Sequence, residues 1–219
     1  MRNAYKGHHD MTIRQMFATI ALAGTLLCGG VVALDTSTAS AAPASTGAVA
    51  ATSDQIALTA ASALAAMGTS LFPVRLGEVT NAAATQLEAD AGRLFTAWAK
   101  ADRAHQIALL SALTQVGVPY RRNASKVGVA FDCSGLTAYA WGQAGIEIAH
   151  QSRRQLRSSG LRTADTAQAG DLVYYPGHVM LWLGVDKLIV EAPERGRDVE
   201  VDQLGNRHIK HLKFADPTG

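Results

Sequence analysis

Cysteine is scarce in this chain, and neither sign of charge dominates. The 219 residues include 2 cysteines, Cys28 and Cys133, and 20 Lys and Arg residues against 18 Asp and Glu residues. The formal net charge of +2 excludes a polybasic arm for nucleic acid and an acidic, solvating tail. The sequence has no C-x-x-C pair, H-E-x-x-H motif, Gly-rich phosphate loop or G-x-S-x-G motif. We therefore expect no metal or other cofactor and no nucleic-acid partner.

The first 41 residues have the three parts of a secretory signal peptide. Residues 1–16 contain several basic side chains, Phe17–Leu34 contains no charge, and Ala39-Ser40-Ala41 supplies a small-x-small ending. Two alternatives stay open. The apolar run is long enough for a retained membrane anchor, and Cys28 invites a lipoprotein interpretation, although Leu27 stands where a lipobox has a small residue. We predict cleavage after Ala41, secretion to the cell envelope, and no stable membrane insertion of the mature chain.

Residues 42–101 are predicted to form an Ala-rich helical segment ahead of the main domain. A leader of Ala, Pro, Ser, Thr and Gly precedes a weakly patterned helix, which Phe72-Pro73 is expected to break. Asn81 is expected to cap a second helix, whose apolar residues from Leu87 to Trp98 follow a 3.6-residue spacing. Two roles stay open for this segment: packing against the following domain, or covering the active groove as a pro-segment.

The second half of the chain alternates in the manner of a small α+β domain. A short helical run ends at Gly145, and β-like runs follow at 171–175, 178–183, 187–192 and 198–201. The connections between these runs are short enough to form hairpins, so the sheet is predicted to be antiparallel. We expect this sheet to pack on helices, in a domain that extends from residue 102 to residue 219.

Cys133 is the only cysteine that remains after signal cleavage. By itself it is consistent with a buried structural thiol, but it stands at the expected first turn of a helix, where unpaired N–H groups favour a thiolate. A cysteine nucleophile needs a base on another element. His178 opens an apolar strand and Glu191 ends the next one, so a hairpin would bring the imidazole and the carboxylate together. Of the remaining histidines of the mature chain, His150 is left open and the others are expected at the surface: His105, His208 and His211.

Four motifs, in this order, resemble the NlpC/P60 cysteine peptidases: Gly117-Val118-Pro119-Tyr120, 131–136 (F-D-C-S-G-L), 170–175 (G-D-L-V-Y-Y) and Gly177-His178-Val179. The resemblance implies a papain-like core, circularly permuted relative to papain. It also implies hydrolysis of peptidoglycan stem peptides, between D-glutamate and the diamino acid. Carried over by position, Cys133 is the nucleophile, His178 the base and Glu191 the third polar residue.

The resemblance further implies which residues contact the substrate. Positions that line the site in the family are matched by Tyr120, Asp132 and Ser134. The loop after the catalytic helix is matched by Ser152 and Gln155. The chain departs from the family at Arg121-Arg122-Asn123, where members commonly have an aromatic residue and two glycines. Since those glycines let a loop approach the cleft, we expect the substrate edge to differ there.

Several functions stay open beside that of a secreted endopeptidase. A wall-binding or regulatory protein would have lost catalysis, and the intact Cys133–His178 pair argues against it. An amidase or acyltransferase would use the same scaffold on another substrate, and an antibacterial toxin would differ only in delivery. No LysM, SH3-like or choline-binding repeat is visible. Wall targeting is therefore left to the catalytic domain, the helices or a protein partner.

Overall fold

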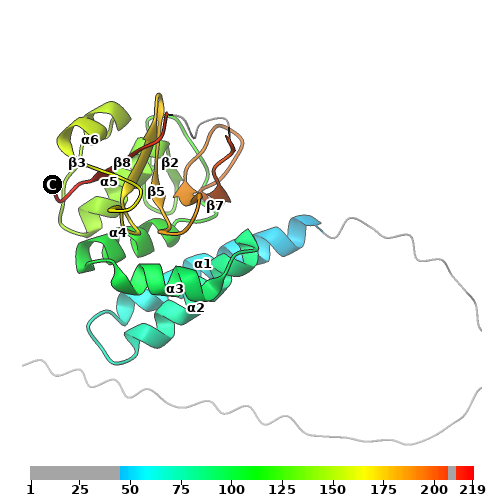
Figure 1. The fold of residues 1–219 in the computed structure, drawn as a ribbon. Coiled ribbons are helices and arrows are strands. Elements are labelled where there is room, and N and C mark those ends of the chain that lie inside the picture. The colour runs from blue at the N-terminus through cyan, green and yellow to red at the C-terminus, as the bar shows by residue number, and fades with distance from the viewer. Residues whose placement is uncertain (1–44, 207–210) are drawn as a thin grey trace, which may run out of the picture. The chain divides into compact units, whose positions relative to one another are not determined.

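The computed structural model describes residues 45–206 and 211–219, and residues 41–219 form one compact unit (Figure 1). The predicted signal peptide lies outside the described residues. None of the described helices combines the length and the apolar character that crossing a membrane requires. The helices are α1 (Ser45–Ala65), α2 (Phe72–Leu87), α3 (Ala91–Lys100), α4 (Arg103–Leu113), α5 (Cys133–Gln143) and α6 (Ser152–Ser158).

The main sheet is antiparallel, as the short connections predicted. Its strand order among the described residues is β3-β8-β4-β5-β6-β7, and a two-stranded ribbon, β1-β2, lies apart from it. The strands are β1 (Ser125–Lys126), β2 (Ala130–Phe131), β3 (Gly160–Arg162), β4 (Leu172–Tyr175), β5 (His178–Trp182), β6 (Leu188–Glu191), β7 (Glu200–Gln203) and β8 (Lys213–Asp216). Strands β4 to β7 form the predicted meander, and β8 returns to lie between β3 and β4.

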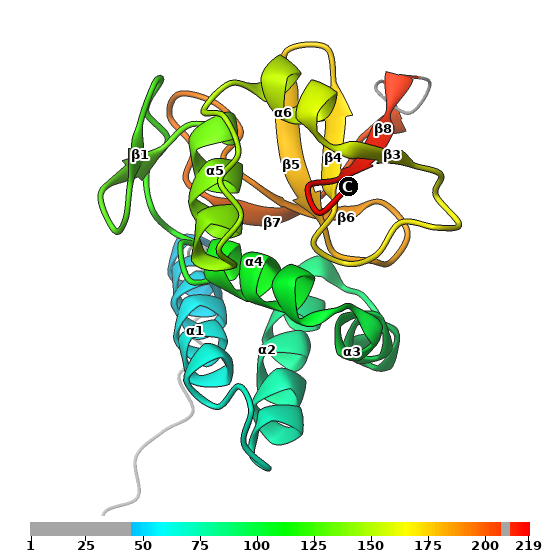
Figure 2. The ribbon, with the colours of Figure 1, turned by 90° about the vertical axis from the view of Figure 1, so that its left-hand side faces the viewer.

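The core lies between α5 and one face of this sheet. Figure 2 shows α5 beside the sheet, with α4 across the end of α5. Alternate residues of β4 and β5, such as Leu172, Val179 and Leu181, face the helices and are fully buried beside Leu136 and Trp141 of α5. The other face carries a smaller cluster around Met180 and Trp182. Because both faces are covered, β5 reads as a continuous apolar run after its first residue.

The helix boundaries before residue 90 differ from the prediction. Phe72-Pro73 does not break a helix but begins α2, because proline is tolerated in a first turn, where its missing N–H has no acceptor. Asn81 lies inside α2 and is not a cap. The helix ends at Glu88, which has a left-handed φ of 51°. Asp90 caps α3 by accepting a hydrogen bond of 3.0 Å from the backbone N–H of Arg93.

Helix α3 is attached to the sheet at the hairpin between β5 and β6. Trp98 Nε1 donates a hydrogen bond of 2.8 Å to the backbone oxygen of Leu183, in the buried interior. At the surface, Arg93 and Asp186 form a two-pronged ion pair with distances of 2.7 and 2.9 Å. Both contacts lie beyond the last residue of β5, whereas His178 is its first residue. The described α3 therefore packs at the end of β5 remote from His178.

The expectation that His105 lies at the surface is wrong. Its side chain in α4 is fully buried, with Nδ1 2.8 Å from Asp102 and Nε2 3.0 Å from Asp171. Asp216 of β8 approaches the same Nε2 at 3.4 Å, and the Trp141 ring meets the imidazole edge-on at 4.8 Å. Asp102 caps α4 itself, but Asp171 and Asp216 come from sequence positions far from this helix, so the tertiary fold supplies most of the charge that permits burial of His105.

Candidate active site

Cys133 is the first residue of α5 and is half-exposed. The helix begins there because Asp132 has an extended backbone, and its carboxylate accepts a hydrogen bond of 2.7 Å from the N–H of Gly135. The first-turn N–H groups of Cys133 and Ser134 have no acceptor within the helix. They give the helix end a partial positive charge next to the sulfur, which favours a thiolate.

His178 lies between Cys133 and Glu191. Its Nε2 hydrogen-bonds the carboxylate of Glu191, and the Cys133 side chain lies close enough to the imidazole to influence its pKa. Since Nε2 is occupied by Glu191, Nδ1 is the ring nitrogen that remains for the sulfur. Both His178 and Glu191 are more than nine-tenths buried. The structure thus brings the three predicted catalytic residues together, with His178 hydrogen-bonded to Glu191 and next to Cys133.

The surroundings of His178 favour its charged form. Burial alone would lower its pKa, but the hydrogen bonds to Cys133 and Glu191 and the charges of both groups raise it from 6.5 to about 9. An imidazolium is therefore the expected state of His178 at neutral pH. That state supplies a proton donor beside Cys133.

Asp132 holds together the loops that surround the nucleophile. One carboxylate oxygen accepts hydrogen bonds from Gly135 N–H and from the Ser134 hydroxyl, at 3.1 Å, and lies 2.9 Å from His150 Nε2. The other oxygen accepts a bond of 2.8 Å from the N–H of Asn123, which has a left-handed φ of 58°. Asp132 is buried and its oxygens are engaged inside the protein. The structure therefore gives it a positioning role, and adds His150, whose partner is visible only in the folded chain.

Gly135 is a glycine because the loop before the helix passes directly over it. A Cβ at this position would lie 2.1 Å from the backbone oxygen of Ala124 and 2.9 Å from His150 Nε2. The same loop residue accepts a hydrogen bond of 2.9 Å from the N–H of Asp132. The glycine of the D-C-S-G motif thus permits the close approach that fixes the start of α5.

Two tyrosines lie beside the catalytic residues. Tyr120 is half-buried, and burial together with the negative charges of Cys133 and Asp132 raises its pKa above 10. Tyr175 is the direct cross-strand neighbour of His178, with ring centroids 5.2 Å apart. Burial and the charge of Glu191 raise its pKa as well. Tyr120 thus lies near Cys133 and Asp132, and its contact with substrate stays a prediction, whereas the position of Tyr175 follows only from the strand register.

The other residues that were predicted to contact substrate are less accessible to a substrate. Gln155 is fully buried, where its amide binds Thr137 at 2.8 Å and the backbone oxygen of Ser134 at 2.9 Å. The buried Ser134 hydroxyl donates to Asp132. Both side chains therefore connect α5 with its neighbours instead of facing an open cleft. Ser152, at the start of α6, is half-exposed and stays a candidate contact.

Glu200 lies across the sheet from Glu191 and adds a second carboxylate behind His178. Burial raises its pKa to about 7; the nearby Arg197 opposes this shift, while Asp202 and Glu191 add to it. Glu200 also contacts Arg197, which reaches Asp202 at 3.2 Å. The negative charge next to Glu191 therefore grows as the pH rises through about 7.

Two groups of described residues bring ligand-type atoms within 4.8 Å of one another: His105, Asp171 and Asp216, and Glu191, Glu200 and Asp202. In the first group the histidine already pairs with both carboxylates, and in the second Arg197 supplies the opposite charge. These pairings explain the short separations without an ion. The expected lack of a metal stays a prediction.

The fold and the site together define a class of protein. An antiparallel sheet packs on a helix that begins at a cysteine, and the first residue of a strand presents a histidine to it. This α+β arrangement is that of the papain-like folds, as predicted. Residues 117–215 match the family model of the NlpC/P60 family, so this part of the chain is an NlpC/P60 domain. The resemblance seen in the four motifs is thereby confirmed.

Relatives with curated names share parts of this chain. It is 36% identical over 100 residues to dipeptidyl-peptidase 6 of Lysinibacillus sphaericus, covering 45% of this chain and 36% of that protein. It is 31% identical over 137 residues to murein DD-endopeptidase MepH of Escherichia coli, covering 58% and 48%. A crystal structure of an NlpC/P60 family protein from Bacillus cereus is 25% identical, with a TM-score of 0.47 over 51% of this chain and 39% of that one. The chain thus spans about a third to a half of the length of these curated relatives.

Proposed function

We propose that this protein is a secreted cysteine endopeptidase that hydrolyses peptidoglycan stem peptides at the D-γ-glutamyl–diamino acid bond. The observation that carries the proposal is the grouping of Cys133, at a helix N-terminus, with His178 and the Glu191 carboxylate that hydrogen-bonds it. The named peptidases among the relatives support a peptide substrate, and the murein endopeptidase supports one from the cell wall. In this proposal residues 1–41 are the signal peptide, 42–101 a helical segment and 102–219 the catalytic domain.

The first half of the reaction forms a thioester. The Cys133 thiolate attacks the carbonyl carbon of the scissile amide, and the electron pair of the C=O π bond moves to oxygen. First-turn N–H groups of α5 donate hydrogen bonds to this oxyanion. The His178 imidazolium then transfers its proton to the amide nitrogen as the C–N bond breaks, so the amine leaves neutral and the acyl group stays on sulfur.

The second half releases the acyl group. Water attacks the thioester carbonyl while the now neutral His178 accepts one of its protons. The C–S bond breaks, the thiolate is restored opposite an imidazolium, and the product carries a new carboxyl group. Glu191 keeps the imidazole in its orientation and stabilises its charged form in both halves, because the carboxylate hydrogen-bonds Nε2 throughout.

The test is digestion of purified muropeptides by protein comprising residues 41–219, the compact unit. Mass spectrometry should find an L-Ala–D-Glu fragment in the wild-type reaction and none with Cys133→Ala. In this protein Cys133 is the only cysteine, so alkylation by iodoacetamide should abolish activity at one site. Cleavage that persists in Cys133→Ala refutes the mechanism. Intact muropeptides that bind to the wild type would instead support a catalytically silent wall-binding protein.

A further inference from the structure

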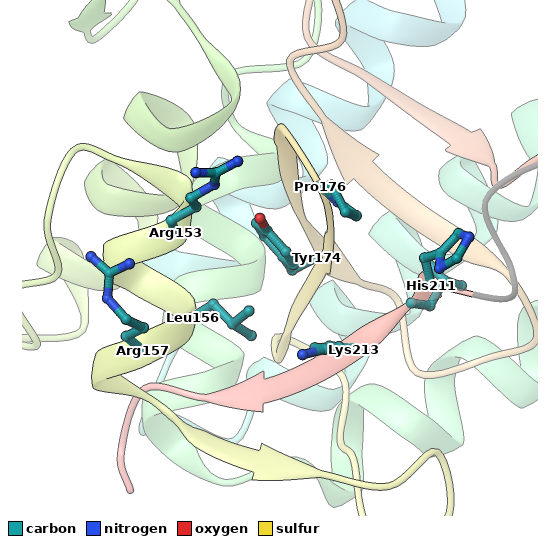
Figure 3. A pocket seen from close by; sticks show the side chains of 8 residues that line it. Arg153, Leu156, Arg157, Tyr174, Pro176, His211 and Lys213 are labelled. Carbon is teal, nitrogen blue, oxygen red and sulfur yellow. The ribbon is translucent and has the colours of Figure 1, made fainter.

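A cationic hollow lies between α6 and the strands β4 and β8. It encloses about 460 Å³ and is lined by Arg153, Leu156 and Arg157 of α6, Tyr174 of β4, and His211 and Lys213 next to or within β8 (Figure 3). Residues 153, 156 and 157 share one helix face by their spacing. Tyr174 and Lys213 are direct cross-strand partners and so share one face of the sheet. Two regular elements thus hold this set of side chains in place.

The charges of this hollow are not neutralised within the described part of the chain. Arg153, Arg157 and Lys213 form none of the ion pairs found there, although four other arginines do so. No acidic residue contributes to the lining. Three like charges gathered around one hollow repel each other unless an anion enters it. The electrostatics therefore select a negatively charged ligand.

The floor of the hollow offers a hydrogen bond in addition to charge. Tyr174 is only 6% exposed, yet its hydroxyl has no hydrogen bond to any other described residue. Figure 3 shows the ring between Leu156 and Pro176, with the hydroxyl directed to the side of Arg153. The residue is buried, but its hydroxyl oxygen is not among the buried unpaired atoms of the described residues, so it faces the hollow. This group is therefore free to donate to a ligand oxygen.

The turn that joins β4 to β5 connects the hollow with His178. Pro176 lines it, Gly177 follows, and His178 is the next residue. In the proposed reaction His178 delivers its proton to the leaving amine, so the part of the substrate beyond the scissile bond lies on the His178 side of Cys133. In a stem peptide that contains diaminopimelate, that part carries the free carboxylate of this diamino acid and the C-terminal carboxylate.

The geometry points to a carboxylate subsite: Arg153, Arg157, Lys213 and the Tyr174 hydroxyl bind the carboxylates of the leaving half of the stem peptide. This inference rests on the proposed function and specifies its substrate. Guanidinium groups suit carboxylates because they donate two parallel hydrogen bonds. Leu156 and Pro176 supply apolar walls for the side chain that carries the carboxylate.

Two peptides test the subsite: a stem tetrapeptide whose carboxylates beyond the scissile bond are free, and the same peptide with both converted to amides. The wild type should cleave the free form with a kcat/KM about tenfold higher, which corresponds to about 1.4 kcal/mol. The double variant R153Q/R157Q should lose this preference through KM, with kcat unchanged. Tyr174→Phe should lower it in part. Lys100→Gln, which removes one exposed charge on α3, is the matched control and should leave it intact.

The outcomes separate the subsite from the reaction. If the double variant slows cleavage of both peptides equally, or if the wild type shows no preference, the subsite is refuted while the endopeptidase stands. If the wild type cleaves neither peptide, calorimetric binding to Cys133→Ala protein decides: a preference for free carboxylates that R153Q/R157Q removes supports the subsite, and equal binding refutes it. Inorganic phosphate that binds more tightly than the free peptide would overturn the assignment to peptide carboxylates.

Discussion

Replacing Glu191 by glutamine should move the alkaline limit of catalysis. Glutamine keeps the shape and a hydrogen-bonding oxygen but removes the negative charge next to His178 Nε2. The rise of the His178 pKa from 6.5 to about 9 corresponds to about 3 kcal/mol in favour of the imidazolium. Glu191 contributes to this rise through both its hydrogen bond and its charge, beside Cys133.

The size of the change follows from the loss of that charge. An opposite charge within about 4–6 Å shifts a pKa by about 1–3, and Cys133 remains in the variant. We expect the pKa of His178 to fall by about 1–2 in Glu191→Gln. Because the imidazolium is the proton donor to the leaving amine, kcat/KM in the wild type should decline as the pH rises through about 9. In the variant this decline should begin nearer to neutral pH.

Two measurements check this expectation. One is the pH profile of kcat/KM with a fluorogenic stem peptide, and the other is titration of the His178 imidazole by NMR, which works even in a variant with little activity. Glu194→Gln is a suitable control because Glu194 is exposed. An alkaline limb and an imidazole pKa that both stay near 9 in Glu191→Gln would refute the role given to Glu191.

Three further predictions concern stability. Gly135→Ala should lower the free energy of unfolding by about 1–3 kcal/mol in thermal denaturation, because its Cβ meets the backbone of Ala124; an unchanged Tm would contradict this close approach. His105→Gln should cost about 3–5 kcal/mol, since it leaves buried carboxylates without their charge partner. Burial disfavours the imidazolium of His105, but the bonds to Asp171 and Asp102 raise its pKa above 6.5 overall. The stabilisation that His105 contributes to the folded state should therefore be full below pH 6.5 and should vanish as the pH rises through the folded pKa. A loss of stability on acidification would refute that sign. Trp98→Phe should cost about 1 kcal/mol through the lost hydrogen bond in urea unfolding, and a neutral result would show that this bond adds no net stability.

Local pattern was sufficient to predict how His178 and Glu191 meet. Strands β5 and β6 pair with Leu181 opposite Val190. One residue further along this register, Glu191 faces Met180, on the same side of the sheet as His178 two residues away. Because a short hairpin fixes such a register, the separation of His178 and Glu191 along the sequence predicts that their side chains come into contact. The position of Cys133 could also be predicted from local pattern, because the capping residue before it marks the start of the helix.

Residues whose partners lie far away in the sequence could not be placed in this way. His105 is a titratable residue in a mostly apolar helix, and its carboxylate partners Asp171 and Asp216 come from the sheet region, so its burial depends on contacts that the local sequence does not show. His150 meets Asp132 only because the loop after α5 folds back over the helix start. Gln155 has the composition of a surface residue, yet its amide is fully bonded in the interior. In each case tertiary contacts, rather than local pattern, decide whether a polar side chain is exposed.

The attachment of α3 bears on the two roles left open for the helical segment. Its buried bond from Trp98 to Leu183 and its ion pair from Arg93 to Asp186 both hold it beyond the end of β5. His178 begins the same strand, so the strand itself separates α3 from the candidate site. Cys133 is at the same time half-exposed. These positions favour the packing role for α3, because a helix that masks the nucleophile would have to contact the other end of β5.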